Sequence, residues 1–241
     1  MIDIPTLDFS KLPLTVPSLQ VRGGKEAYPV RRIFCVGLNY LDHAVEMGRS
    51  IERNAPFYFT KSAFSLVQSG STIDYPAQTK NYHHEIEMVV AIGRPAFQVA
   101  AGDVLASVFG YACGLDMTRR DLQVAAREKG RPWDLGKDVE ESAVVSEIVP
   151  AAHIGHPTRG AIELTVNGAP RQHSDIDKLI WSVPEIIADL SRFYHLDAGD
   201  LIFTGTPHGV GAVAPGDFVQ GRIDGIASVA LRIAQTETVK L

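Results

Sequence analysis

Two glutamates stand two residues apart at the start of an apolar run, and no other feature constrains the fold of this chain as strongly. Glu85 and Glu87 precede Met88–Ile92, and the run ends at Gly93. The pattern predicts a strand, in which side chains alternate, so both carboxylates share one face. Burying two like charges is costly unless a Lys, an Arg or a metal ion lies beside them. The alternative is an exposed strand end with two solvated carboxylates.

Short apolar runs that end at turn residues dominate the rest of the chain. They predict strands over 33–36, 57–61, 87–92, 111–115, 162–166, 201–204, 217–219 and 226–233. Asn167-Gly168 and Asp224-Gly225 are typical of β-hairpin turns. Three helices are predicted. A short one covers 40–47 and ends at Gly48, and a second ends at Gly130 and carries Leu122, Ala125 and Ala126 on one face. The third is amphipathic, begins with a capping-box pattern at Ser182–Glu185 and continues to Tyr194. We therefore expect an α+β fold with a rolled or sandwiched sheet.

The composition fits one folded domain. The chain has 241 residues, of which 45% are hydrophobic, enough for a core that needs no disulfide or metal to hold it together. The segment 1–25 predicts an N-terminal arm or short leading strands, and residues 26–241 a single folded domain. Cys35 and Cys113 lie in apolar surroundings and are expected to be buried, reduced thiols.

The charges and the N-terminus narrow the classes of partner. The 23 basic and 28 acidic residues give a net charge of −5, and no basic stripe is present, which argues against a nucleic-acid partner. The N-terminus lacks the pattern of a signal peptide, and no apolar run is long enough to span a bilayer. We expect a cytoplasmic protein with a small-molecule substrate and no membrane partner.

A third carboxylate stands where a predicted strand gives way to a helix. Asp116 in this position is either the N-cap of the helix or, if Thr118 caps it, a ligand beside Glu85 and Glu87. Ligands that are all oxygen favour Mg²⁺, Mn²⁺ or Ca²⁺ over zinc.

Two further segments carry polar groups with open alternatives. His43 and Glu46 are spaced i, i+3, so on a helix a carboxylate can orient an imidazole that activates water; the alternative is an ordinary surface pair. The Gly-rich segment 205–211 lacks the signature of a P-loop or a dinucleotide site. It is either a tight loop that brings backbone and Thr hydroxyl groups to a ligand or a plain turn.

The order of these motifs resembles the fumarylacetoacetate hydrolase family over residues 24–235, and more narrowly its short acylpyruvate hydrolases. The motifs that carry the resemblance are VGLNYLDHAVEMG, FYFTKS, NYHHEIEMVVAIG, YACGLDMTRRDLQ, GRPWDLGKD, LTVNG and GDLIFTGTPHGVG. The resemblance implies a mixed β-sandwich roll, a homodimer, and Mg²⁺ or Mn²⁺ as the cofactor. It implies metal ligands at Glu85, Glu87 and Asp116, catalytic roles for His43, Glu46 and Lys137, and substrate binding by Arg120, Gln123, Gly205 and Thr206.

The implied reaction is the metal-dependent hydrolysis of fumarylpyruvate or maleylpyruvate to pyruvate plus fumarate or maleate, a step of aromatic-compound catabolism of the gentisate type. The alternatives are an oxaloacetate decarboxylase or tautomerase, another acylpyruvase on the same scaffold, and a non-catalytic metal-binding protein. Two positions depart from the family pattern. Leu38 stands where close relatives usually carry Arg, which removes a cation from the expected pocket, and Ser62 stands where they often carry Pro.

Overall fold

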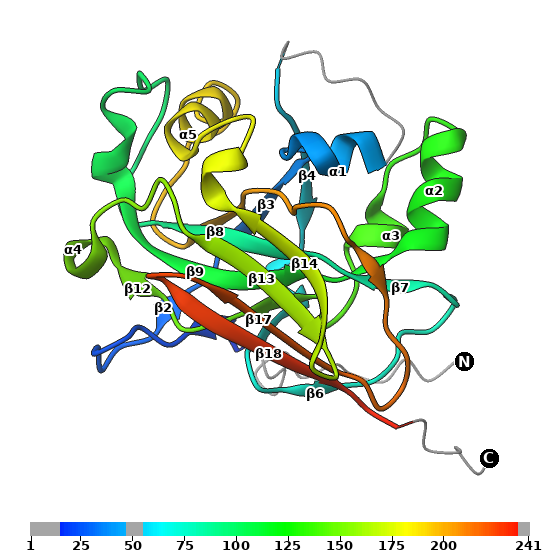
Figure 1. Cartoon of the computed structure of the whole chain (residues 1–241). Helices are drawn as coiled ribbons and strands as arrows, with labels where there is room; N and C mark the ends of the chain where they lie inside the picture. The colour runs from blue at the N-terminus through cyan, green and yellow to red at the C-terminus, as the bar shows by residue number, and fades with distance from the viewer. Residues whose placement is uncertain (1–14, 47–54, 236–241) are drawn as a thin grey trace, which may run out of the picture.

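Two β-sheets face each other across the main hydrophobic core (Figure 1). The structure, a computed structural model, describes residues 15–46 and 55–235. Residues 1–14 of the predicted arm, and Met47 and Gly48 at the predicted end of the first helix, lie outside the described residues.

The larger sheet has eight strands. Its order is β4 (Phe57–Lys61), β3 (Arg32–Gly37), β15 (Asp200–Phe203), β8 (Ile86–Ile92), β9 (Val108–Asp116), β11 (Ala143–Val145) and β5 (Leu66–Gln68), with β12 (Val149–Pro150) paired to β9. The five-stranded sheet runs β14 (Ala169–Asp175), β13 (Ala161–Val166), β17 (Phe218–Ile223), β18 (Ala227–Ile233) and β6 (Thr72–Ile73). Parallel pairs occur at β3–β15, β5–β11 and β6–β18, whereas the other pairs in the two sheets are antiparallel. The predicted mixed, sandwiched α+β fold is confirmed.

Smaller elements complete the described part of the chain. Two short sheets pair β10 (Thr118–Arg119), β7 (Tyr82–His84) and β16 (Gly211–Ala212), and β1 (Ser18–Leu19) with β2 (Tyr28–Pro29). The α-helices are α1 (Leu41–Glu46), α2 (Arg120–Glu128), α3 (Asp134–Lys137), α4 (Ala151–Ile154) and α5 (Val183–Leu190). Single 3₁₀ turns lie at Ala63–Ser65, Val104–Ser107 and Ile176–Lys178. In Figure 1, α1, α2 and α3 gather at the end of the molecule where β7 lies.

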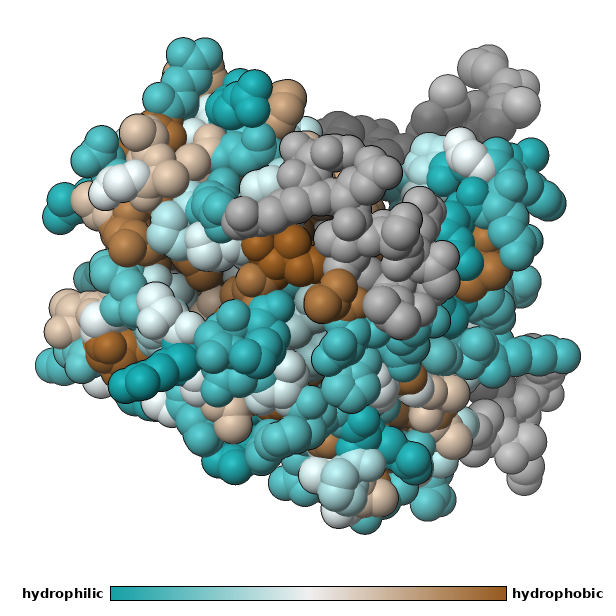
Figure 2. Space-filling view, turned by 45° about the horizontal axis from the view of Figure 1, so that its top comes forward, coloured by the Kyte–Doolittle hydropathy of each residue, from teal (hydrophilic) through white to brown (hydrophobic). Residues whose placement is uncertain are grey.

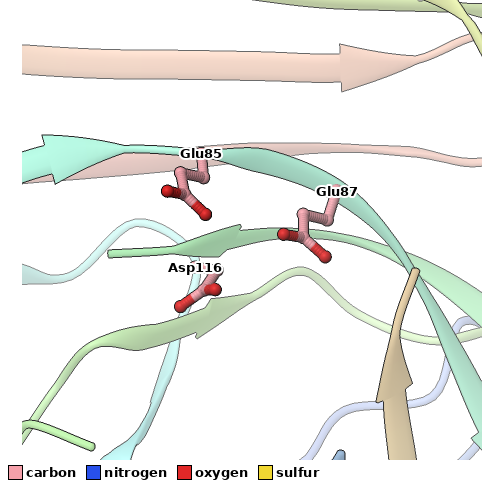
Figure 3. Close-up of side chains that lie close together, drawn as sticks. All are labelled: Glu85, Glu87 and Asp116. Carbon is pink, nitrogen blue, oxygen red and sulfur yellow. The ribbon is translucent and has the colours of Figure 1, made fainter. Parts of the chain in front are cut away.

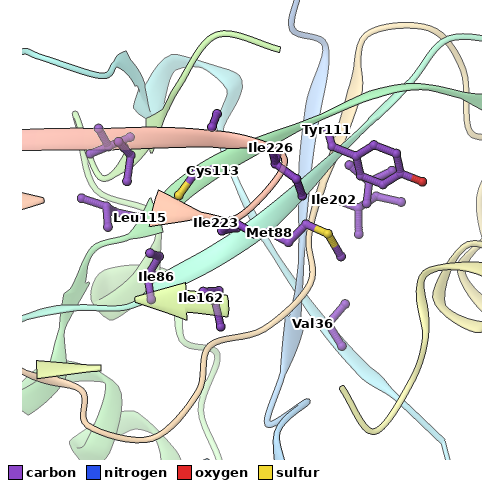
Figure 4. Packing of buried hydrophobic residues seen from close by; sticks show 14 of the residues in the cluster. Val36, Ile86, Met88, Tyr111, Cys113, Leu115, Ile162, Ile202, Ile223 and Ile226 are labelled. Carbon is purple, nitrogen blue, oxygen red and sulfur yellow. The ribbon is translucent and has the colours of Figure 1, made fainter. Parts of the chain in front are cut away.

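Alternation along β8 explains why this strand is buried on both faces. Ile86 and Met88 point toward the five-stranded sheet, where they join Ile162 and Ile223 in the main core (Figure 4). The intervening residues, such as Val89, belong to a second apolar cluster on the opposite face. Glu85 and Glu87 have the same parity as Val89, so their side chains start this second face.

Local sequence patterns correctly predicted one hairpin turn and the start of one helix. Asn167 and Gly168 both have positive φ, of 52° and 78°, and they join β13 to β14 as a hairpin. At the start of α5, the Glu185 carboxylate accepts hydrogen bonds from the Ser182 backbone N–H and hydroxyl, at 2.9 and 2.7 Å.

Helix α2 differs from its prediction in two ways. It begins at Arg120, and its N-cap residue is Arg119, so neither Asp116 nor Thr118 caps it. Its fully buried residues are Arg120 and Gln123, whereas the predicted apolar face is exposed or half-buried. The helix therefore packs a polar face inward, which an ordinary amphipathic helix does not do. In addition, α5 ends at Leu190, four residues before the end of its predicted apolar pattern.

The surface viewed from the side of α1, α2 and α5 is mainly hydrophilic, with hydrophobic residues in separate patches (Figure 2). Among the helices of the described residues, none has the length and apolar content needed to cross a bilayer.

Candidate functional site

Glu85, Glu87 and Asp116 meet on one face of the larger sheet (Figure 3). Strands β8 and β9 are antiparallel neighbours, and the Asp116 backbone N–H donates to Glu85 O at 2.9 Å, which sets the two side chains next to each other. One carboxylate oxygen from each residue lies within 4.8 Å of the others. The three residues are 4%, 2% and 0% exposed, so the alternative of a solvated strand end is wrong.

Three cations surround this carboxylate triad. Lys137 Nζ donates to Glu85 Oε2 at 2.8 Å, to Asp116 Oδ2 at 2.6 Å and to Thr118 Oγ1 at 2.8 Å. Arg120 forms an ion pair with the other oxygen of Glu85. Lys61 Nζ lies 2.9 Å from Asp116 Oδ1. All three cations are buried, and three positive charges formally balance the three carboxylates.

The cations are distributed unevenly over the triad. Burial opposes the ionisation of Glu85, but Lys137 and Arg120 beside it outweigh burial and hold the pKa of its carboxyl well below its usual range. Glu87 forms no ion pair with any described residue. Burial, together with the nearby charges of Asp116 and Glu85, raises the pKa of Glu87 well above its usual value.

The triad fits a hard divalent cation. Glu87 is a buried carboxylate without a cationic partner among the described residues, and the buried Asp116 Oδ1 accepts no hydrogen bond although Lys61 lies beside it. The carboxylate of Glu87 and the Oδ1 atom of Asp116 thus keep lone pairs that a bound cation can accept. Three carboxylates are a donor set that suits Mg²⁺ or Mn²⁺ and does not suit zinc.

The Gly-rich loop that follows β15 secures one member of the triad. The backbone N–H of Gly205 donates to Glu87 Oε2 at 2.6 Å. Gly205 has φ of +98°, and a Cβ at this position would lie 2.7 Å from Asn39 Cβ. Only glycine therefore combines this backbone conformation with so close an approach.

His43 and Glu46 form the predicted dyad on α1. His43 Nδ1 lies 3.0 Å from Glu46 Oε2, and His43 is only 5% exposed. Since a carboxylate only accepts, Nδ1 carries a proton, and in the neutral imidazole Nε2 is the nitrogen with the free lone pair. The carboxylate of Glu46 also accepts a hydrogen bond from Gly209 N at 3.1 Å, which ties α1 to the Gly-rich loop.

The predicted site residues converge on one small cavity. Six of them line it, namely His43, Glu85, Glu87, Gln123, Lys137 and Thr206. The other four lie behind this lining and bond to it: Glu46 to His43, Arg120 to Gln123 and Glu85, Asp116 to Lys137, and Gly205 to Glu87. Leu38, which replaces the usual Arg, also lines the cavity, with φ of 53°.

Two side chains face the cavity as hydrogen-bond donors. Arg120 donates to Gln123 Oε1, so the amide NH₂ of Gln123 is the group that remains for a ligand. Thr206 Oγ1 accepts a hydrogen bond from Gln172 Nε2 at 2.8 Å, which leaves the Thr206 hydroxyl proton to donate.

Two buried residues that the sequence reasoning missed support this arrangement. Lys61 donates to Ser142 Oγ at 2.8 Å and to the backbone O of both Met117 and Lys137, in addition to its contact with Asp116. Gln172 lies on β14, in the five-stranded sheet, and reaches the Gly-rich loop. The position of Lys61 at the end of an aromatic, strand-forming segment could have indicated a buried lysine. Gln172 lies in a polar strand, and nothing in its local sequence indicates a buried role.

Comparison with known proteins gives three consistent matches. The family described as fumarylacetoacetate (FAA) hydrolase C-terminal matches residues 32–234. A fumarylpyruvate hydrolase of Ralstonia sp is 56% identical over 79% of this chain and 100% of its own length. The mitochondrial oxaloacetate tautomerase FAHD1 of Rattus norvegicus is 40% identical over 86% of this chain and 93% of its own.

A solved structure is similar throughout the fold. The fumarylpyruvate hydrolase of Pseudomonas aeruginosa, crystallised with Mn²⁺ and pyruvate, superposes with a TM-score of 0.90 and 49% identity, covering 93% of this chain and 98% of that one. The presence of Mn²⁺ in that relative agrees with the divalent cation that the buried triad indicates here.

Proposed function

Because this chain belongs to the fumarylacetoacetate hydrolase family, we propose that it hydrolyses the carbon–carbon bond of a 2,4-diketo acid, with fumarylpyruvate as substrate and pyruvate and fumarate as products. The motifs alone leave maleylpyruvate as an equal alternative. Two relatives named fumarylpyruvate hydrolase, at 56% and 49% identity, favour the fumaryl substrate.

One observation carries the proposal: Glu85 and Glu87 of the carboxylate triad and His43 of the dyad line the same cavity. Hydrolysis of a diketo acid needs both a centre that stabilises negative charge on the leaving group and a base that activates water. His43 and Glu87 line one small space, so both requirements can act on one substrate molecule.

The residues that would hold the metal are Glu85, Glu87 and Asp116. When bound, a divalent cation supplies Lewis-acid stabilisation of the keto-acid oxygens. We infer Mn²⁺ or Mg²⁺ as the physiological ion, and the Mn²⁺ in the Pseudomonas aeruginosa relative supports the former.

The dyad supplies the base. His43 Nε2 takes a proton from water, while Glu46 holds Nδ1–H and stabilises the resulting imidazolium. The hydroxide forms a C–O bond at the acyl carbonyl carbon, and the bond from that carbon to the methylene group then breaks. The electron pair leaves with the pyruvate half as an enolate. Its carbon accepts the proton that His43 took from water, which gives pyruvate and restores the neutral imidazole.

Donors around the cavity position the substrate. The NH₂ group of Gln123 and the hydroxyl of Thr206 can donate to its oxygens. Lys137 has all three of its N–H groups directed at Glu85, Asp116 and Thr118, so its proposed role at the oxyanion requires that one of these acceptors releases it.

The charge of the site supports an anionic substrate. The three carboxylates balance Lys61, Lys137 and Arg120, so a bound divalent cation brings the centre to +2. The leaving pyruvate half carries two negative charges, one on its carboxylate and one on its enolate oxygen, and these neutralise the centre.

The test is a substrate panel. The purified protein with Mn²⁺ is given fumarylpyruvate, maleylpyruvate, acetylpyruvate and oxaloacetate, and loss of the enol absorbance is recorded together with pyruvate release. We expect the highest kcat/KM for fumarylpyruvate. Pyruvate release from none of the diketo acids would rule out the proposed hydrolysis.

A second candidate is oxaloacetate tautomerisation, which the relative of Rattus norvegicus favours at 40% identity. Tautomerisation needs the stabilised enolate but no activated water, so the hydrogen-bonded His43–Glu46 pair supports hydrolysis. The same panel separates the two, because a tautomerase converts enol to keto oxaloacetate without releasing pyruvate.

Finer features of the proposal come from the family resemblance. We infer a homodimer, which light scattering of the purified protein tests, with residues 26–241 as the catalytic domain after the arm at 1–25. A place in gentisate-type aromatic catabolism follows from the substrate. A cytoplasmic location remains part of the same proposal.

A further inference from the structure

Arg127 is a fourth cation at the cavity that contains the carboxylate triad. It lies in the last turn of α2, is half-buried and lines the same space as His43 and Thr206. The other three cations are bonded to the triad, but no described carboxylate forms an ion pair with Arg127. A guanidinium that faces a ligand cavity, and that pairs with no carboxylate of residues 15–46 and 55–235, is available to bind an anion.

The helix places Arg127 at a distance from the triad. Arg120, Gln123 and Arg127 are spaced i, i+3 and i+7, so they lie on one face of α2. Arg120 is bonded to Glu85, and seven residues of helix advance about 10 Å along its axis. The backbone of Arg127 is therefore about a small molecule's length from that of Arg120, the residue of this helix that is bonded to the triad.

The wall of the cavity suits a flat, conjugated chain. Phe57 and Trp133 line it, with ring centroids 5.5 Å apart in an edge-to-face arrangement. These rings supply apolar contact for carbon atoms that lie between two charged ends. Leu38, in the loop after β3, also lines the cavity but contributes no charge. The additional cation at the cavity, Arg127, therefore comes from α2.

We propose that Arg127 is a specificity-determining residue that binds the distal carboxylate of the acyl group. This inference rests on the proposed function. A divalent cation held by the triad would neutralise the keto-acid end of the substrate, which leaves the far carboxylate of a fumaryl group in need of a partner. The planar guanidinium can pair with that carboxylate through two parallel N–H···O bonds. A substrate that ends in a methyl group, such as acetylpyruvate, gains nothing from this contact.

The test compares two substrates in four proteins loaded with Mn²⁺: wild type, R127Q, R127K and R131Q. The quantity measured is the ratio of kcat/KM for fumarylpyruvate to kcat/KM for acetylpyruvate. In R127Q we expect this ratio to fall about 10- to 100-fold, the range of a lost hydrogen bond to a charged group. R127K keeps the charge but lacks the planar fork, so its ratio falls less. Arg131 is exposed four residues further on, and R131Q, which removes the same charge, leaves the ratio unchanged.

Several results would overturn the inference. An unchanged ratio in R127Q, whether both rates fall together or neither falls, shows that Arg127 does not read the distal carboxylate. An equal fall in R131Q assigns the effect to general attraction of anions. A wild-type protein that hydrolyses acetylpyruvate as well as fumarylpyruvate contradicts this inference but leaves hydrolysis intact. The absence of hydrolysis of both contradicts the proposed function itself.

Discussion

Gln172 Nε2 lies 2.8 Å from Thr206 Oγ1, and both side chains are buried. The orientation of the Gln172 amide is fixed, because Nε2 also donates to Pro207 O at 2.8 Å and Oε1 accepts from Ile86 N at 3.2 Å. Thr206 therefore cannot turn its proton toward Gln172 and must direct it elsewhere. A residue of the five-stranded sheet thus sets the hydrogen-bonding role of a residue at the cavity.

The first prediction concerns this pair. Thr206→Val removes the donor, and we expect kcat/KM for fumarylpyruvate to fall about 10- to 100-fold. Gln172→Met leaves Thr206 free to rotate and should lower kcat/KM by a smaller factor. The double variant should then be no worse than Thr206→Val alone, a non-additivity of about 1 kcal/mol or more. Additive losses would show that the two residues act independently.

The second prediction concerns Glu87, the buried carboxylate without an ion-pair partner among the described residues. Glu87→Gln should weaken Mn²⁺ binding by more than about 100-fold, beyond the cost of altering a neighbour of a metal ligand. Without metal, the variant should melt at the same temperature as the wild type or higher. Burial and the charges of Asp116 and Glu85 raise the pKa of Glu87, so a negative charge is unfavourable at this position, and a neutral amide avoids that charge while its oxygen can still accept from Gly205 N.

Calorimetry with Mn²⁺ and thermal melts without it provide both measurements. Glu163→Gln is the matched control: this carboxylate pairs with Arg222 on the five-stranded sheet and does not line the cavity, so Mn²⁺ affinity should not change. Unchanged Mn²⁺ affinity in Glu87→Gln would remove Glu87 from the metal site.

The third prediction concerns Lys61, which is fully buried beside Asp116. Lys61→Met leaves Asp116 with one fewer cation and removes three further hydrogen bonds of the ammonium group. We expect a loss of about 3–5 kcal/mol in the free energy of unfolding, measured with urea. Thr60→Ala, on the exposed face of the same strand, should cost less than about 1 kcal/mol. Comparable values for the two variants would contradict a structural role for Lys61.

The fourth prediction separates backbone strain from close packing. Gly205 and Gly70 have nearly equal φ angles, +98° and +93°, but only Gly205 has a neighbour, Asn39, within contact of an added Cβ. Gly70→Ala should cost about 1–2 kcal/mol of stability. Gly205→Ala should cost more and should also weaken Mn²⁺ binding, because the displaced backbone N–H donates to Glu87. Equal melting temperatures for the two variants would contradict the packing argument.

Much of the fold could be predicted from local patterns. Alternation along β8 predicted the common face of Glu85 and Glu87, and Asn167-Gly168 predicted the hairpin, because both signals depend only on backbone geometry. The buried face of helix α2 was predicted wrongly because the helix has both an apolar face and a polar face. The polar face is the buried one, since Arg120 on it pairs with Glu85. Its cap was misread for a similar reason, since Thr118 instead accepts a hydrogen bond from Lys137.

The supporting residues of the site could not be found in this way. Gln172 and Thr206 are 34 residues apart in the chain, and only the packing of the two sheets brings them together. Lys61 lies on β4 and Asp116 on β9, and three other strands stand between β4 and β9 in the sheet order, so no local pattern predicts their contact. Arg127 looked like an ordinary cation in the last turn of a helix. The triad and dyad, in contrast, followed from the resemblance to the family, because the metal-ligand and dyad positions of its motifs are all occupied in this sequence.

The central claim is that His43 activates water in a cavity shared with the carboxylate triad. The most direct test measures fumarylpyruvate hydrolysis and Mn²⁺ affinity together in His43→Ala. Our account predicts that kcat falls about 10²- to 10⁴-fold while Mn²⁺ affinity stays at the wild-type value, because His43 serves as the base and is not a metal ligand. Hydrolysis at the wild-type rate in His43→Ala would contradict it.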